Sequence, residues 1–197
     1  YGFQVSVVPR VDTDRFFDVR TFDPRRVLPA EHPGKLTFAV RNLRRVRTCF
    51  RIDHSDYVFQ LQPCGYIELT RVLGRRSEEA NEPLSRQRLI PSRALVTGLW
   101  ECLEVFARLH SAGAYNGQVR VYFRLFGAEG VGLGVPNSMF ATPRFDGNDW
   151  ATYADTSVFS MLRTTKPVVH ELMDYLWQAF TFDKCFLLDE NHELVRH

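Results

Sequence analysis

The sequence predicts an α+β fold, in which a mainly antiparallel sheet is packed by two main helices. Strand-like segments follow one another between residues 35 and 73, and their connections are short and rich in turn-forming residues. Two later segments, residues 92–112 and 167–180, carry apolar residues at helical spacing instead. Strands and helices do not alternate along the whole chain, as a doubly wound sheet would require.

The N-terminal part of the chain is expected to form strands that are connected mainly as a meander. Residues 3–8 have the pattern of a strand that ends at Pro9. Residues 12–33 are expected to be irregular, because prolines interrupt them and the pair Asp23-Pro24 favours a turn. Further strands are predicted at residues 35–41, 45–53, 57–62 and 66–73.

The remaining elements follow a polar break in the chain. Residues 74–87 have no apolar periodicity, so they are expected to form a mobile loop or a boundary near residues 74–90 within a single module of residues 1–197. A helix with Ser92 as its N-cap is predicted next, and Gly113 ends it. The last predicted elements are a strand at 118–126, a loop-rich stretch at 133–165, a helix from Pro167 to residue 180 and a hairpin with its turn at 189–192.

The composition is typical of a globular protein, with 45% hydrophobic and 24% charged residues and a formal net charge of +2. That charge is too small to attract the whole chain to nucleic acid or to a membrane, so any basic surface must be local. No segment approaches the roughly 20 apolar residues that cross a bilayer. The chain starts at Tyr1, directly before a strand, so we expect a piece of a longer protein whose other domain is a partner.

The spacing of the cysteines and of the glycines argues against a metal site and a phosphate-binding loop. The four cysteines are scattered without a CxxC pair, which is not the pattern of a zinc site or of a disulfide framework. Reduced thiols in a cytoplasmic protein are the simplest interpretation. The glycines after Phe126 lack the spacing of a phosphate-binding loop. The sequence therefore predicts no metal ion and no cofactor.

Two predicted strands pair an apolar face with a basic face. Apolar and basic residues alternate over residues 46–52, and they do so again over residues 118–126. Arginine binds phosphate in bidentate geometry, and an exposed tyrosine can stack on a base. The candidate residues for nucleic-acid or polyanion binding are Arg45, Arg47, Arg51, Arg120, Tyr122 and Arg124. The alternatives are a solvated face, where Glu68 on a neighbouring strand pairs with one arginine, and a face for a protein partner.

Other polar or aromatic groups suggest weaker alternatives. Asp53, His54 and Asp56 combine two carboxylates with an imidazole, which suits proton transfer or a divalent metal, although neighbouring turn positions point in different directions. His170 opens the second helix without a second histidine at helical spacing, so it is expected at the surface. An apolar patch for a like subunit is a third alternative, formed by Trp100, Trp177 or Phe140.

One part of the chain resembles a known family. The residues concerned are Gly65-Tyr66-Ile67-Glu68-Leu69, the segment 89–92 that leads into the first helix, Gly113, the strand at 119–125 and the glycines of 127–133. This arrangement resembles the region that follows the N-terminal Schlafen-like (Alba-type, DNA-binding) domain of bacterial proteins, and it covers about half of the chain. The resemblance implies a C-terminal sensing or assembly region, and it transfers no catalytic residue.

Together these observations favour a non-enzymatic sensor, regulatory or assembly module of a larger, cytoplasmic bacterial protein. One alternative is nucleic-acid binding through the arginine-striped strands. Another is a hydrolytic or metal-dependent enzyme that uses Asp53, His54 and Asp56. The partners expected are another domain of the same longer chain, nucleic acid or a second copy of the chain, and no membrane.

Overall fold

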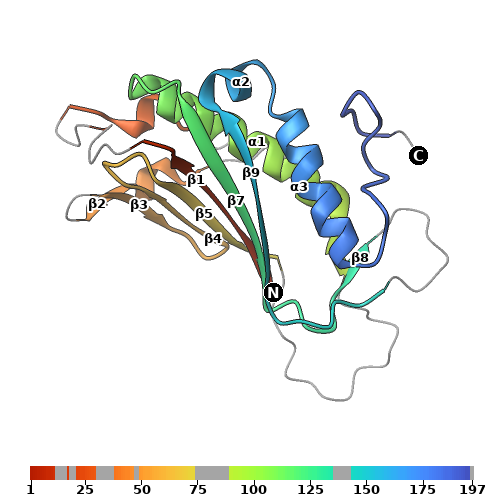
Figure 1. The fold of residues 1–197 in the computed structure, drawn as a ribbon. Helices are drawn as coiled ribbons and strands as arrows, with labels where there is room; N and C mark the ends of the chain where they lie inside the picture. The colour runs from red at the N-terminus through yellow and green to blue at the C-terminus, as the bar shows by residue number, and fades with distance from the viewer. Residues whose placement is uncertain are drawn as a thin grey trace.

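The protein forms a seven-stranded antiparallel sheet with its two long helices on one side (Figure 1). This computed structural model describes residues 1–11, 17, 21–29, 38–46, 49–73, 89–134 and 143–195. The predicted α+β class is confirmed. The elements are β1 (Gly2–Pro9), η1 (Pro24–Arg26), η2 (Val40–Asn42), β2 (Arg44–Val46), β3 (Cys49–Asp53), β4 (Tyr57–Leu61), β5 (Ile67–Val72), β6 (Leu89–Pro91), α1 (Ser92–Ala112), β7 (Gln118–Phe126), β8 (Gly132–Gly134), β9 (Trp150–Ser157), α2 (Val158–Arg163) and α3 (Lys166–Ala179).

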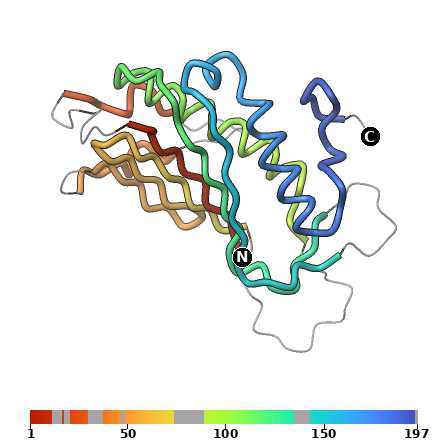
Figure 2. The backbone as a smooth tube through the Cα atoms, viewed as in Figure 1, coloured from red at the N-terminus to blue at the C-terminus, as the bar shows by residue number. Residues whose placement is uncertain are grey.

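The strand order of the main sheet is β2-β3-β4-β5-β1-β7-β9. Strands β2 to β5 form the expected meander, and β1 then lies between β5 and β7, as the backbone trace shows (Figure 2). The short strands β6 and β8 form a separate parallel pair. Among the described residues, no helix is long and apolar enough to cross a membrane.

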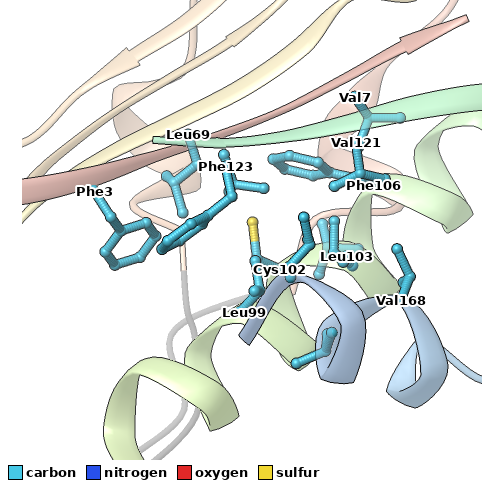
Figure 3. Packing of buried hydrophobic residues seen from close by; sticks show 14 of the residues in the cluster. Phe3, Val7, Leu69, Leu99, Cys102, Leu103, Phe106, Val121, Phe123 and Val168 are labelled. Carbon is cyan, nitrogen blue, oxygen red and sulfur yellow. The ribbon is translucent and has the colours of Figure 1, made fainter. Parts of the chain in front are cut away.

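The core lies between the sheet and the helices. Val5 of β1 stands directly opposite Leu69 of β5 and Phe123 of β7, so their side chains share one face. All three are fully or almost fully buried. Leu99 and Phe106 of α1 point toward this face (Figure 3). The apolar residues that alternate in the strands and those at helical spacing in α1 therefore form one hydrophobic cluster. This cluster includes residues from both sides of the predicted boundary at 74–90.

A buried histidine ties α1 to the turn between β4 and β5. The His110 ring is fully buried, with Nδ1 2.9 Å from the carbonyl oxygen of Phe106 and Nε2 2.7 Å from that of Gly65. Gly65 has a φ of 81°, a conformation that glycine adopts without strain. With its proton on Nε2, the imidazole donates to the carbonyl oxygen of Gly65, which the core would otherwise leave without a donor.

The predicted strand at 45–53 is wrong in one respect, because it is two strands. β2 and β3 form a hairpin, with Arg44 opposite Arg51 and Arg45 opposite Phe50. The alternation of apolar and basic residues continues through the reversal, so the pattern alone did not reveal it. The predicted strand at 35–41 is also wrong where it is described, since residues from Val40 form the 3-10 helix η2.

The stretch at 133–165, predicted as loop-rich, contains β9 and α2. β9 pairs with β7 at eight positions, although its core-facing residues include Thr152 and Ala154, which are only weakly apolar. The helix at 92–112 is confirmed, but the Ser92 hydroxyl donates to the carbonyl oxygen of Gly134 and does not cap the helix. The loop predicted at 74–87 lies outside the described residues. The terminal hairpin is confirmed by the bridge between Leu188 and Leu194.

Candidate functional site

The face of the sheet opposite α1 and α3 is polar and carries most of the candidate residues. We call it the open face. Direct cross-strand neighbours form one row across all seven strands of this face. From β2 to β9, the row is Arg44, Arg51, Gln60, Glu68, Ser6, Tyr122 and Tyr153.

The β9 end of the open face carries two exposed tyrosines. Tyr122 and Tyr153 stand opposite each other with ring centroids 5.9 Å apart, and they are 40% and 50% exposed. The Arg120 guanidinium lies 4.1 Å from the centroid of the Tyr153 ring. It also donates to both carboxylate oxygens of Asp155, at 2.8 and 2.9 Å. We call Tyr122, Tyr153, Arg120 and Asp155 the tyrosine patch.

Each candidate arginine of β3 and β7 is paired with an aspartate. Besides the Arg120–Asp155 pair, Arg124 contacts Asp149 at 2.7 Å and Arg51 contacts Asp53 at 2.8 Å. Hydrogen bonds from the guanidinium groups lower the pKa of Asp149 and of Asp155 below the usual carboxyl range, so both stay ionised at neutral pH. A phosphate group would therefore have to compete with a carboxylate for each of these arginines.

The candidate arginines do not form one stripe. Arg45 is exposed but stands opposite Phe50, so it lies on the other face from Arg51. Arg47 lies outside the described residues. Arg51 on β3 is separated from β7 by three intervening strands, which corresponds to about 19 Å at the usual spacing between strands. Polyanion binding by these residues stays a prediction.

Glu68 occupies the centre of the open face, between the two groups of arginines. Its carboxylate accepts hydrogen bonds from the Tyr66 hydroxyl, from Gln4 Nε2 at 2.5 Å and from Thr70 Oγ1 at 3.3 Å. Burial, together with the adjacent Glu68 carboxylate, raises the pKa of Tyr66 to about 12. The predicted ion pair between Glu68 and an arginine is therefore replaced by this neutral donor set, and the arginines use aspartates.

The turn that carries Asp53, His54 and Asp56 does not gather its polar groups. All three residues are exposed, and Asp53 is engaged by Arg51. The His54 ring stacks on Tyr57, with centroids 4.9 Å apart, and its Nδ1 lies 3.9 Å from Asp56 Oδ2. Because the two carboxylates have different neighbours, this geometry provides no common point for a substrate or a metal.

The predicted apolar patch for a like subunit is not formed by the tryptophans. Trp177 is fully buried in the core, and Trp100 is half-buried against it. Phe140 lies outside the described residues. The Trp177 ring meets that of Phe186 in the C-terminal segment, with centroids 6.0 Å apart, and its large apolar surface is covered by the core.

Sequence reasoning missed Tyr153, and it did not place Asp149 and Asp155 beside the arginines of β7. They lie in or next to β9, in the stretch predicted as loop. The signal that could have identified the strand is the series of β-forming residues Thr152, Tyr153 and Thr156.

Comparisons with protein-family models, curated proteins and solved structures found no match for this chain. The resemblance to the region that follows Schlafen-like domains stays a prediction.

Proposed function

We propose that this chain is a non-enzymatic assembly module, in which the tyrosine patch binds a second copy of the same chain. The observation that carries the proposal is the pair of exposed tyrosines on the last two strands of the sheet, β7 and β9, beside the Arg120–Asp155 ion pair.

The composition of the patch suits a protein interface. Tyrosine and arginine are enriched among the residues that contribute most to binding between proteins. The rings of Tyr122 and Tyr153 already contact each other, and Arg120 already lies over Tyr153. Binding therefore loses little side-chain entropy, because these side chains are ordered before the partner arrives.

The charge pattern favours a like subunit as that partner. Asp155 is shared by Arg120 and Arg10, and Asp149 is paired with Arg124, so this end of the open face carries both signs of charge. A face with both signs can meet its own copy across a two-fold axis without net repulsion, and two-fold dimers are the commonest oligomers.

The two edges of the sheet differ in a way that supports the same proposal. The edge strand β2 has three residues, two of them arginines, and short charged edges resist pairing. The opposite edge strand, β9, has eight residues and contains no lysine, arginine or proline. In the sheet order, β9 has a strand neighbour on one side only. Its edge is thus the one suited to continue the sheet into a second copy.

The experiment is sedimentation velocity over a series of protein concentrations from micromolar to near-millimolar, after nuclease treatment. The native chain is expected to shift from monomer to dimer. Tyr153→Ser is expected to weaken dimerisation by about 700-fold, because an interface aromatic contributes about 2 kcal/mol and each two-fold dimer contains the residue twice.

The matched control is Tyr175→Ser. Tyr175 lies on α3 and is 43% exposed, close to the exposure of Tyr153, but it is remote from the open face. It is expected to dimerise like the native chain. A native chain that stays monomeric at the highest concentration refutes the proposal, and so does an equal effect of the two substitutions.

A further inference from the structure

The C-terminal segment is fastened to one face of α3. Lys166, His170 and Asp174 follow one another at intervals of four residues, so they lie on the same side of this helix. Each contacts a residue of the segment that follows. Lys166 pairs with Glu193, His170 meets His192, and Asp174 Oδ1 accepts a hydrogen bond from the Cys185 backbone N–H at 2.7 Å.

The central contact joins two imidazole rings. Nδ1 of His170 lies 2.6 Å from Nδ1 of His192, and the rings are nearly perpendicular, with an interplanar angle of 81°. The His170 side chain is only 16% exposed, so its predicted place at the surface is wrong. At this distance one Nδ1 carries the proton and donates it to the other, or a metal ion that both nitrogens bind takes the place of that proton.

A second, independent feature concerns the backbone of His192. This residue has a φ of 61°, in the left-handed region where glycine and asparagine are preferred and other residues are strained. Its turn is fixed by Asp189, whose side chain accepts hydrogen bonds from the backbone N–H groups of Asn191 and Glu193 at 2.9 and 2.8 Å. The turn thus holds an imidazole, at some conformational cost, at the point where it faces His170.

We propose that Nδ1 of His170 and Nδ1 of His192 bind a transition-metal ion of the zinc class. Imidazole nitrogens suit zinc, copper and nickel, whereas magnesium and calcium prefer oxygen ligands. Bonds of about 2.0–2.1 Å in tetrahedral geometry place two nitrogens about 3.3 Å apart, so the rings need to separate by about 0.7 Å. Among the described residues, no three metal-binding side chains gather, so water fills the remaining positions.

Asp174 is a positioning residue in this site, because it orients the ring of His170. Its Oδ1 lies 3.7 Å from Nε2 of His170, on the side of the ring away from His192. Histidines that bind metals usually turn their second ring nitrogen toward a carboxylate or a carbonyl, which keeps the proton on that nitrogen and leaves the other free for the metal. The bound ion then crosslinks α3 to the C-terminal turn. This inference is independent of the assembly proposed above.

The test is calorimetric titration of the metal-free protein with zinc chloride alone. One site is expected, and magnesium chloride is expected to produce no binding heat. His192→Gly removes one ligand while it also relieves the left-handed backbone, so this variant is expected to fold and to lose zinc binding. Asp174→Asn keeps the acceptor for Cys185 but loses the charge, and it is expected to weaken zinc binding by about 10–100-fold.

The matched control is His54→Gln, which removes an exposed histidine that lies beside a carboxylate elsewhere in the fold. It is expected to bind zinc like the native chain. Thermal unfolding provides a second measurement, because an ion that binds only the folded state raises the melting temperature of the native chain but not that of the glycine variant. No zinc binding by the native chain, full binding by the glycine variant, or loss of binding in the control each overturns the proposal.

Discussion

Replacing Phe123 with alanine tests whether the sheet has one buried and one open face. Phe123 is fully buried, and its ring lies 5.9 Å from that of Phe3 and 6.2 Å from that of Trp150. Truncation of a buried phenylalanine costs about 3–5 kcal/mol, and aromatic pairs add about 0.5–1.5 kcal/mol each to simple burial. With two ring neighbours, we expect the free energy of unfolding to fall by about 4–5 kcal/mol.

Urea unfolding followed by circular dichroism measures this loss. For a slope of about 2 kcal/mol per molar urea, the midpoint is expected to fall by roughly 2 M. The matched control is Tyr122→Ala, at the neighbouring position of the same strand but on the open face. Its loss is limited mainly to the cross-strand pair with Tyr153, which corresponds to about 1 kcal/mol.

Equal losses for the two substitutions would refute the reasoning, because they would mean that both faces of β7 are equally buried. A loss below about 2 kcal/mol for Phe123→Ala would also contradict it, since the ring would then not belong to a well-packed core.

Three further predictions concern titration and charge. The pKa of Tyr66 is raised to about 12 from an ordinary value near 10, so its contribution to stability is complete below pH 10 and is lost as the pH rises through 12. The difference in tyrosinate absorbance between the native chain and Tyr66→Phe, followed against pH, measures the pKa of this residue. Burial lowers the pKa of His110, so stability is expected to be complete above the ordinary histidine value of about 6.5 and to decrease on acidification; urea midpoints across this range should lose that slope in His110→Gln. In electrophoretic mobility shift assays with short single- and double-stranded DNA and RNA at two salt concentrations, we expect no salt-sensitive binding. A mobility shift that the native chain produces and Arg120→Ala abolishes would instead favour polyanion binding over assembly.

The sequence was most informative where one pattern continued over a whole element. The alternation around Phe123 and the helical spacing around Leu99 both correspond to single elements with one buried side, so strand, helix and core could be predicted together. The hairpin at Arg45 could not, because alternation continues across the reversal and only the three-dimensional pairing separates β2 from β3. Because of that reversal, Arg45 lies on the opposite face of the sheet from Arg51.

The candidate sites depended on contacts between distant parts of the chain. Arg120 could be recognised as one of a series of arginines, but its partner Asp155 lies 35 positions later, in a strand with weak local propensity. His170 and His192 are 22 residues apart, and only the docking of the terminal turn on α3 brings them together. Local patterns contain no information about such pairs.

The position of β1 has a consequence for how the molecule folds. Among the described strands, the meander β2–β5 and the pair β7–β9 are joined only through β1, which hydrogen-bonds to β5 on one side and to β7 on the other. β1 must therefore wait for β7, more than 100 residues later in the chain, before its second side is paired. Such long-range closure slows folding. It also makes the two parts of the sheet interdependent, so we expect them to unfold together in a single transition.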